Sequence, residues 1–436
     1  MSAALENAPV QILPESHQSP PVGWPSWFRE LQCAAQEEFE RCPSPSRKDE
    51  AWRYSDLAAL DLSSFVPATF PDGRESLIAA SCGLGDVAAR MVLANNRLIA
   101  LDTKGLPEGV LLKPLDVAAR EDEALFREFF MAQPVELGSH RFAELHRSRL
   151  ESGALLYVPP GLEVDLPIEI FHWVQGAHAS VYPHTLIICG ERSKVTVVDS
   201  FRSADGKPAF ACGVNDLHLG AGARLNYIAV QEWSDKTLAF HINSTTVAKD
   251  ATSTALCANF GGAFVRGESY SRMIGEGARS EMFSLSPLDG SRQVDQRTLQ
   301  DHAAPNASSD LLYLNALDDT SRSIFAGLIK VQEGAHRTDA YQKVRNLILS
   351  DTSEANSMPG LEILADDVRC THGATSGEIN EEELFYFEAR GIPRSLGRKL
   401  IVNGFFQTLL ERIEGCALRT YLSRLVSAKL GVSPSE

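Results

Sequence analysis

A cysteine and a histidine two residues apart carry the most informative chemistry in this sequence. They are Cys370 and His372, within the segment PGLEILADDVRCTHGATSG at residues 359–377. On an extended backbone, side chains two residues apart point to the same face. A thiolate and an imidazole on one face form a soft and a borderline ligand, a pair suited to iron, zinc or copper(I). A single Cys-x-His motif is too short to establish a metal site by itself. The alternative is a packed cysteine beside a surface histidine.

The residues around this pair predict a strand, a turn and then a helix. The apolar run at 361–364 predicts a buried strand, which the acidic pair Asp366-Asp367 ends. Gly373 and Gly377 are expected to bracket a turn that leads into a helical tail. Three acidic side chains are either oxygen donors for a metal ion or turn caps, and these are Asp366, Asp367 and Glu378.

Composition and charge limit the classes of function. The chain has 436 residues, enough for two or three domains, and a net charge of -16 that argues against non-specific binding to nucleic acid or an anionic membrane. Its eight cysteines are scattered without a CxxC motif, which indicates reduced thiols in a cytoplasmic protein. The N-terminus does not have the pattern of a signal peptide, and no apolar run has transmembrane length. Residues 1–22 are rich in Pro, Ser and Gln and predict a disordered arm.

The region 23–152 is expected to form an N-terminal helical domain. Apolar residues recur at steps of three and four near its start, and again over 121–132 and 139–150. Residues 87–101 predict a short hairpin around an Asn-Asn pair. Trp52 and Tyr54 lie in a polar segment, and we expect them to anchor this loop to the domain.

Beyond Gly153 the hydrophobic period changes from near 3.6 to 2, and short strands follow one another. A small residue follows a turn and precedes a strand at six positions, spaced by 30, 28, 27, 29 and 28 residues. These positions are Ser193, Ala223, Ala251, Ala278, Ala307 and Ala335. Such a steady interval predicts that residues 153–377 form a parallel β-helix. The alternative, a β-sandwich, does not require a constant interval between its strands. The last coil must be capped or paired, and 359–377 falls there.

After Gly377 the pattern predicts helices over 378–436. Asn380 is expected to cap the first helix, Gly391 to end it, and Pro393 to begin the second. The apolar stripes of these helices predict mutual packing into a small bundle, with docking of a partner as the alternative.

Several of these stretches closely resemble the SufB/SufD family, components of the SufBCD complex of iron–sulfur cluster assembly. The longest is PGLEILADDVRCTHGATSGEINEEELFYFEARGI, residues 359–392. Supporting stretches are PSRKDEAWRYSDL, GALLYVPPGLEVDLPIEIF and FAGLIKVQEGAHRTDAYQKVRNLILS, at 45–57, 153–171 and 325–350. The Cys-x-His-Gly sequence is similar to the SufD branch of the family. The resemblance extends from about Pro45 to Phe406.

The resemblance implies a mainly β fold, with a right-handed parallel β-helix core flanked by N-terminal and C-terminal helical domains. It implies pairing with a SufB-like paralogue through the β-helix, and binding of a SufC-like ATPase through the C-terminal helices. A histidine of the motif, here His372, would then contribute to a transient iron–sulfur cluster or iron at the SufB junction. Cys370 is the second candidate ligand, and flavin binding is left open. We expect the partner-binding residues to be Leu384, Phe385, Tyr386, Arg390, Leu400 and Phe405.

The sequence lacks the common catalytic motifs. It contains no GxxxxGK[ST], G-x-S-x-G or HExxH, so we expect a non-enzymatic component whose ATP hydrolysis comes from a partner. The alternatives are a purely structural adaptor and a polysaccharide-active enzyme on a β-helix. The remaining strand and turn histidines are expected to be structural, and they are His172, His184, His218, His241, His302 and His336.

Overall fold

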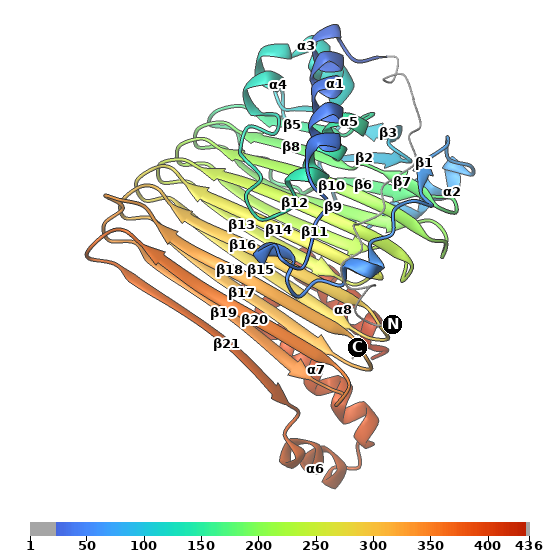
Figure 1. Cartoon of the computed structure of the whole chain (residues 1–436), viewed down its shortest axis with the longest axis vertical. Coiled ribbons are helices and arrows are strands. Elements are labelled where there is room, and N and C mark those ends of the chain that lie inside the picture. Colours follow the sequence, from blue (N-terminus) through green and yellow to red (C-terminus); the bar gives the residue numbers. More distant parts are fainter. Residues whose placement is uncertain (1–22, 433–436) are drawn as a thin grey trace.

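The structure, a computed structural model, describes residues 23–432, so the predicted arm at 1–22 lies outside the described residues. Two long sheets stack into a β-solenoid, and helical layers from both ends of the chain cover it (Figure 1). From β5 to β21 all neighbouring strands within each sheet pair in parallel. The predicted parallel β-helix is therefore confirmed, and the β-sandwich is excluded.

From β8 onward the strands alternate between the two sheets along the chain. Sheet A contains β1 Val66–Pro67, β4 Leu111–Pro114, β5 Ala154–Val158, β7 Ala179–Val181, β8 His184–Cys189, β10 Ala209–Leu219, β12 Thr237–Val247, β14 Phe264–Met273, β16 Gln293–His302, β18 Arg322–Val331 and β20 Glu354–Ile363. Sheet B contains β2 Ala89–Ala94, β3 Arg97–Asp102, β6 Ile168–Val174, β9 Lys194–Ser203, β11 Arg224–Glu232, β13 Thr252–Asn259, β15 Arg279–Leu288, β17 Ser308–Leu317, β19 Asp339–Ile348 and β21 Arg369–Glu378.

One sequence interval corresponds to one coil of the solenoid. Arg224 in β11 pairs with Lys194 of the preceding coil and with Thr252 of the next. The six small residues lie at the corner before each sheet B strand and are almost completely buried. At this corner the amide of Ala223 donates to the carbonyl of Gly220 at 3.0 Å, in a turn that each later coil stacks upon. A larger side chain would not fit between stacked corners, which explains the repeat of Ala and Ser.

The N-terminal layer covers the outer face of sheet A. Its helices are α1 Ser26–Arg41, α3 Leu115–Glu121, α4 Glu123–Phe129 and α5 His140–Arg149, whereas α2 Arg74–Ala80 packs on β2 and β6 of sheet B. Apolar side chains of α5 and of the loop at Trp52 pack on phenylalanines of β10, β12 and β14. The predicted hairpin is confirmed as β2 and β3, with positive φ angles of 48° at Asn95 and 61° at Asn96.

This region contains the short strands β1 and β4 in addition to its helices and the predicted hairpin. Strand β2 pairs in parallel with β6 and extends sheet B, and β4 pairs antiparallel with β5 and extends sheet A. Strands β2 and β4 pair with segments that lie about 40 to 80 residues later in the sequence, as the pairing of Ala89 in β2 with Ile168 shows. Local periodicity does not carry that information.

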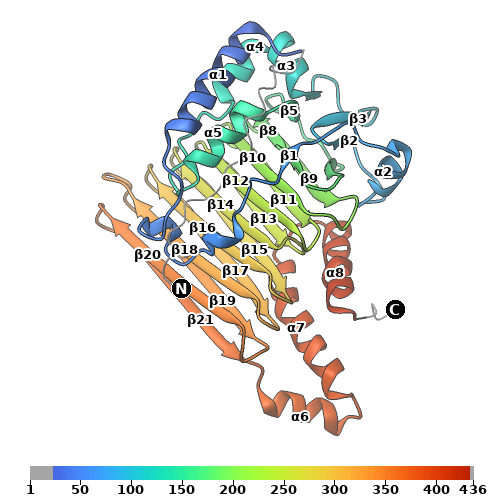
Figure 2. The ribbon, with the colours of Figure 1, turned by 45° about the vertical axis from the view of Figure 1, so that its right-hand side comes forward.

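The C-terminal layer covers the outer face of sheet B (Figure 2). It comprises α7 Arg394–Leu410 and α8 Cys416–Leu430, whereas α6 Glu381–Ala389 packs on α7 and lies beyond the sheet. The Asn380 side chain accepts from the amide of Glu382 at 2.9 Å, and Gly391 ends α6 with a φ of 79°, as predicted. The apolar stripes of α7 and α8 pack on β13, β15 and β17 as well as on each other. Within residues 23–432 no helix is both long and apolar enough to cross a membrane.

Candidate site at the open end of the solenoid

The last coil of the solenoid has two unpaired strand edges. Strand β20 ends sheet A and β21 ends sheet B, at the opposite end from β4 and β3 (Figure 1). Each has a neighbour on one side only among the described residues. Their outer edges therefore present free backbone N–H and C=O groups, which can pair with strands of another chain. The sequence predicted such an end at 359–377.

His372 lies on the row of side chains that face the interior of the solenoid. In β19, Ala340 and Gln342 are buried between the sheets, and the register places Cys370 beside Ala340 and His372 beside Gln342. His372 is nevertheless exposed, because no further coil covers it within residues 23–432. The predicted shared face of Cys370 and His372 is thus present, at the uncovered end of the interior row.

A side chain of the preceding coil contacts this interior-facing row and holds the two final strands together. The Asn346 side chain donates to the hydroxyl of Ser357 in β20 and to that of Ser376 in β21, both at 3.2 Å. One amide group therefore bridges the two final strands from the preceding coil. The final strands are aligned from within, while their outer edges are free.

Strand β20 exposes apolar side chains at the same end. Leu361 and Ile363 pair in register with the fully buried Ile329 and Val331, yet they are 37% and 41% exposed. The prediction of a buried strand at 361–364 is therefore wrong for the chain alone. The alternation is that of a buried strand, but these side chains form the last layer of the stack and nothing in the described chain covers them.

Cys370 lies deeper than His372. It packs against an apolar cluster that contains Ile329, Val331 and Ala340. Burial raises the pKa of the Cys370 thiol, and the negative charge of Asp339 adds to this effect. At neutral pH the thiol is therefore protonated, and it must lose a proton to bind a metal. Of the two side chains, the imidazole is the more accessible donor.

The turn that precedes β21 is centred on the acidic pair rather than on glycines. Asp367 has a φ of 56°, the amide of Arg337 donates to its carbonyl at 2.7 Å, and the His336 ring contacts the carbonyl of Asp366 at 3.0 Å. Strand β21 continues through Gly373, so the predicted turn there is wrong. The carboxylates at the turn and at the end of β21 are exposed, and they are Asp366, Asp367 and Glu378.

The six residues expected to bind a partner differ in exposure. On α6, Phe385 is 70% exposed, Tyr386 is also exposed, and the Arg390 guanidinium lies 5.0 Å from the centre of the Tyr386 ring. Leu384 is buried and fixes α6 to the rest of the layer. Leu400 and Phe405 on α7 are half-buried. Only the three α6 residues form an open surface.

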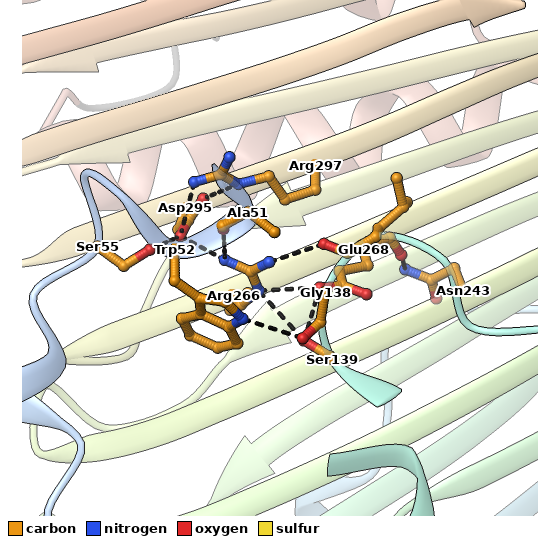
Figure 3. Close-up of polar contacts among 11 residues, drawn as sticks. Ala51, Trp52, Ser55, Gly138, Ser139, Asn243, Arg266, Glu268, Asp295 and Arg297 are labelled. Atoms are coloured by element: carbon orange, nitrogen blue, oxygen red, sulfur yellow. Dashed lines mark hydrogen bonds and ion pairs between the residues drawn. The ribbon is translucent and has the colours of Figure 1, made fainter. Parts of the chain in front are cut away.

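A buried polar cluster joins the N-terminal layer to sheet A (Figure 3). At its centre the fully buried Arg266 in β14 donates to Asp295 at 2.7 Å and to Glu268 at 2.9 Å. It also donates to the carbonyls of Ala51 and Leu137 at 3.1 and 2.9 Å. All the donor nitrogens of the guanidinium therefore have partners from three segments of the chain.

An aromatic contact and a second arginine complete this cluster. The Arg266 guanidinium lies 3.8 Å from the centre of the Trp52 ring, whose indole N–H donates to the carbonyl of Gly138 at 3.0 Å. Burial by itself raises the pKa of Asp295, but the charges of Arg266 and Arg297 outweigh burial and lower the pKa overall. The prediction that Trp52 anchors its loop is confirmed, but Tyr54 is 38% exposed and does not share this role. The arginine was missed. The sequence signal for this ion pair was an Arg and an Asp 29 residues apart, because residues one coil apart occupy equivalent positions on neighbouring strands.

Several of the histidines expected to be structural are buried with partners. His172 lies 3.3 Å from Asp199, His184 lies 3.3 Å from Asp216, and the indole of Trp233 donates to His241 at 3.1 Å. Most partners lie about one coil away in sequence, so no short motif reveals them. Burial lowers the pKa of His241 and of His302 to about 4.

Comparison with protein families supports the resemblance. Residues 172–405 match a family described as "SUF system FeS cluster assembly, SufBD core domain", and residues 24–170 match "SufBD protein N-terminal region". An iron–sulfur cluster assembly SufBD family protein of Synechocystis is 26% identical over 404 residues, 88% of this chain and 87% of the relative.

Two further relatives bear the name iron–sulfur cluster assembly protein SufD. The Escherichia coli protein is 27% identical over 391 residues, 88% of this chain and 89% of the relative. The Bacillus subtilis protein is 24% identical over 427 residues, 95% and 96% of the two chains. The core match alone spans more than half of the 436 residues. On this coverage, and with the solenoid fold, the chain belongs to the SufBD family of iron–sulfur cluster assembly proteins.

Proposed function

We propose that this chain is a non-enzymatic scaffold component of a cytoplasmic SufBCD-type complex that assembles iron–sulfur clusters. It pairs with a SufB-like paralogue through β20 and β21, and His372 donates one ligand to iron or to a nascent cluster at that junction. The single observation that carries the proposal is the position of His372, exposed on the interior row of a terminal strand that has no neighbour on its outer side among the described residues.

Pairing at this end is favoured by both the backbone and the side chains. Two free strand edges and the exposed Leu361, Ile363 and Leu364 lie together on the last coil. A partner with a similar solenoid would continue both sheets and bury these side chains, at about 25 cal/mol for each Å² of apolar area. Its own terminal strand would then lie next to His372.

An imidazole suits a site that must both hold and release iron. Thiolates bind iron firmly, whereas an imidazole is a weaker donor that protonation can release. In this proposal the partner supplies thiolates and this chain supplies the labile ligand. Cys370 is a reserve ligand, because its raised pKa requires loss of a proton before it binds.

The C-terminal helices are the proposed docking site of a SufC-like ATPase. Phe385, Tyr386 and Arg390 form an exposed aromatic and cationic surface on α6. Aromatic and arginine side chains are the residue types that most often dominate binding energy. Because α6 begins at Glu381, only three residues after β21 ends at Glu378, movement of the helix would pull directly on the ligand strand.

The test is the His372→Ala variant, co-expressed with the SufB-like and SufC-like partners. The complex is purified by size exclusion, reconstituted without oxygen, and examined by absorption and Mössbauer spectroscopy. We expect the complex to remain intact and its cluster content to fall about tenfold, since one ligand is lost. The matched control is His336→Ala, an exposed histidine at the turn of the same end, with cluster content near that of the wild type.

Two further outcomes separate the alternatives. The Cys370→Ala variant is expected to keep most of its cluster, because the thiol is packed and protonated. An intact complex with unchanged cluster content in His372→Ala would contradict the ligand role, and the chain would then be a structural adaptor.

A further inference from the structure

Three metal-binding side chains of different chemistry meet where α1 ends and α5 begins, in the N-terminal layer. Glu38 is in the last turn of α1, Cys42 directly follows the helix, and His140 is the first residue of α5. Their ligand atoms all lie within 4.8 Å of one another. The Cys42 thiol donates to the Glu38 carboxylate over 3.4 Å, and the His140 Nε2 atom lies 3.8 Å from the same oxygen.

These separations are close to those of a tetrahedral metal site. With metal–sulfur bonds of about 2.3 Å and metal–nitrogen or metal–oxygen bonds of about 2.0–2.1 Å, neighbouring ligand atoms are about 3.3–3.6 Å apart. We propose that Glu38, Cys42 and His140 bind one borderline divalent cation, Zn²⁺ or Fe²⁺, with the fourth position open to solvent. One thiolate, one carboxylate and one neutral imidazole balance the double positive charge.

The backbone of the site is held in place without the metal. The adjacent Arg141 is buried, and its guanidinium donates to the carbonyls of Phe39, at 2.7 Å, and of Cys42. It also lies 4.3 Å from the centre of the Phe39 ring. Arg141 therefore fixes the end of α1 against the start of α5, so that small side-chain rotations suffice to close the ligands around a cation.

The local charges leave one carboxylate oxygen available. Arg41 forms an ion pair with the Oε2 atom of Glu38, whereas the Oε1 atom faces Cys42 and His140. The Arg41 side chain is 75% exposed, so it can stay on Oε2 or turn into solvent. When the cation binds, the thiol proton that now lies between Cys42 and Glu38 is released to water, and the sulfur–metal bond takes its place.

The experiment is a titration of the full-length chain with Co²⁺, whose thiolate complexes show a charge-transfer band in the near ultraviolet. A Cys370→Ala/His372→Ala background removes any signal from the open end of the solenoid. We expect about one Co²⁺ per chain, displaced by Zn²⁺. Anaerobic competition with Fe²⁺ then decides which of the two cations is preferred.

Single substitutions identify the ligands. Cys42→Ser is expected to lose the charge-transfer band, whereas Cys33→Ser, at an exposed cysteine on the same helix, keeps it. His140→Ala and Glu38→Gln should each weaken Co²⁺ binding about tenfold or more. Circular dichroism confirms that each variant is folded. A band that persists in Cys42→Ser, or an affinity unchanged in His140→Ala, would overturn the proposal.

Discussion

At the scale of single residues, His372 and Cys370 share a face of β21 but differ in how accessible they are to a metal ion. His372 needs no movement, because it is exposed at the end of the interior row. To bind a metal, Cys370 must leave its apolar contacts and lose its thiol proton, and burial opposes this loss by raising the pKa of the thiol. The Cys-x-His spacing predicted the shared face, since strand geometry has a period of two. It did not predict the depth of each side chain, which depends on which coil is the last.

Arg266 is the residue whose importance sequence reasoning missed, because its partners come from the neighbouring coil and from two N-terminal loops. It compensates the buried carboxylates of Glu268 and Asp295 and packs on Trp52 (Figure 3). Arg266→Met would leave the buried carboxylate of Glu268 without a cation, while Arg297 still pairs with Asp295, and is expected to cost about 3–5 kcal/mol of unfolding free energy. Urea denaturation followed by tryptophan fluorescence measures this loss.

The matched control for that substitution lies on the same two strands. Arg272 in β14 pairs with Asp301 in β16, one coil apart like Arg266 and Asp295, but the Arg272 side chain is 44% exposed. Arg272→Met is therefore expected to cost less than about 1 kcal/mol. Equal destabilisation by the two substitutions would contradict the prediction that breaking the buried ion pairs of Arg266 costs more unfolding free energy than breaking the exposed pair of Arg272.

At the scale of elements, local patterns predicted those strands and helices whose partners repeat at a fixed interval. The corner residues, with Ala223 and Ala278 as examples, marked each coil because only small side chains fit there. Glycine misled at Gly373, where an edge strand runs through a position predicted as a turn. A Cβ atom at this position would meet no atom of the described residues within 4 Å, so the strand loses no Cβ packing contact by having a glycine there.

The terminal strand β20 carries the prediction for pairing. Leu361→Lys places a charge on the exposed interior row, where a SufB-like partner would have to bury it. We expect the stability of the isolated chain to change by less than about 0.5 kcal/mol, since the side chain is exposed. The dissociation constant for the SufB-like partner should rise at least about tenfold, as measured by calorimetry or size exclusion.

Strand β3, at the other end of sheet B, supplies the control. Leu101 is 41% exposed there, similar to Leu361, and β3 is also a terminal strand. Leu101→Lys should leave pairing unchanged. If it weakened pairing as much as Leu361→Lys, the partner would not bind specifically at β20 and β21.

At the scale of the whole molecule, the interior between the two sheets carries neutral histidines that make stability depend on pH. The folded-state pKa of His241 and of His302 is lowered to about 4 by burial, below the unfolded value of about 6.5. The unfolded chain therefore binds more protons between these values. Stability is full above about pH 6.5 and falls, for each imidazole, by about 1.4 kcal/mol per pH unit as the pH decreases towards 4.

Denaturation at pH 7, 6 and 5 tests this dependence. His241→Gln removes one titrating group while an amide oxygen can still accept from the Trp233 indole. The variant is expected to lose less stability between pH 7 and 5 than the wild type does. His336→Gln, at an exposed histidine, should follow the wild type. An unchanged pH dependence in His241→Gln would contradict the role of this imidazole.

The connection between the helical layer and the open end predicts how a partner ATPase would act on the site. Helices α7 and α8 pack on sheet B through a large apolar cluster, whereas α6 has only Leu384 buried and is joined to β21 by two residues. A force on α6 is thus expected to move β21 relative to a fixed core and to expose Cys370. In the assembled complex, ATP should accelerate alkylation of Cys370, measured by mass spectrometry. Cys33, exposed on α1, should react at the same rate with and without ATP, and equal rates for Cys370 as well would exclude this coupling.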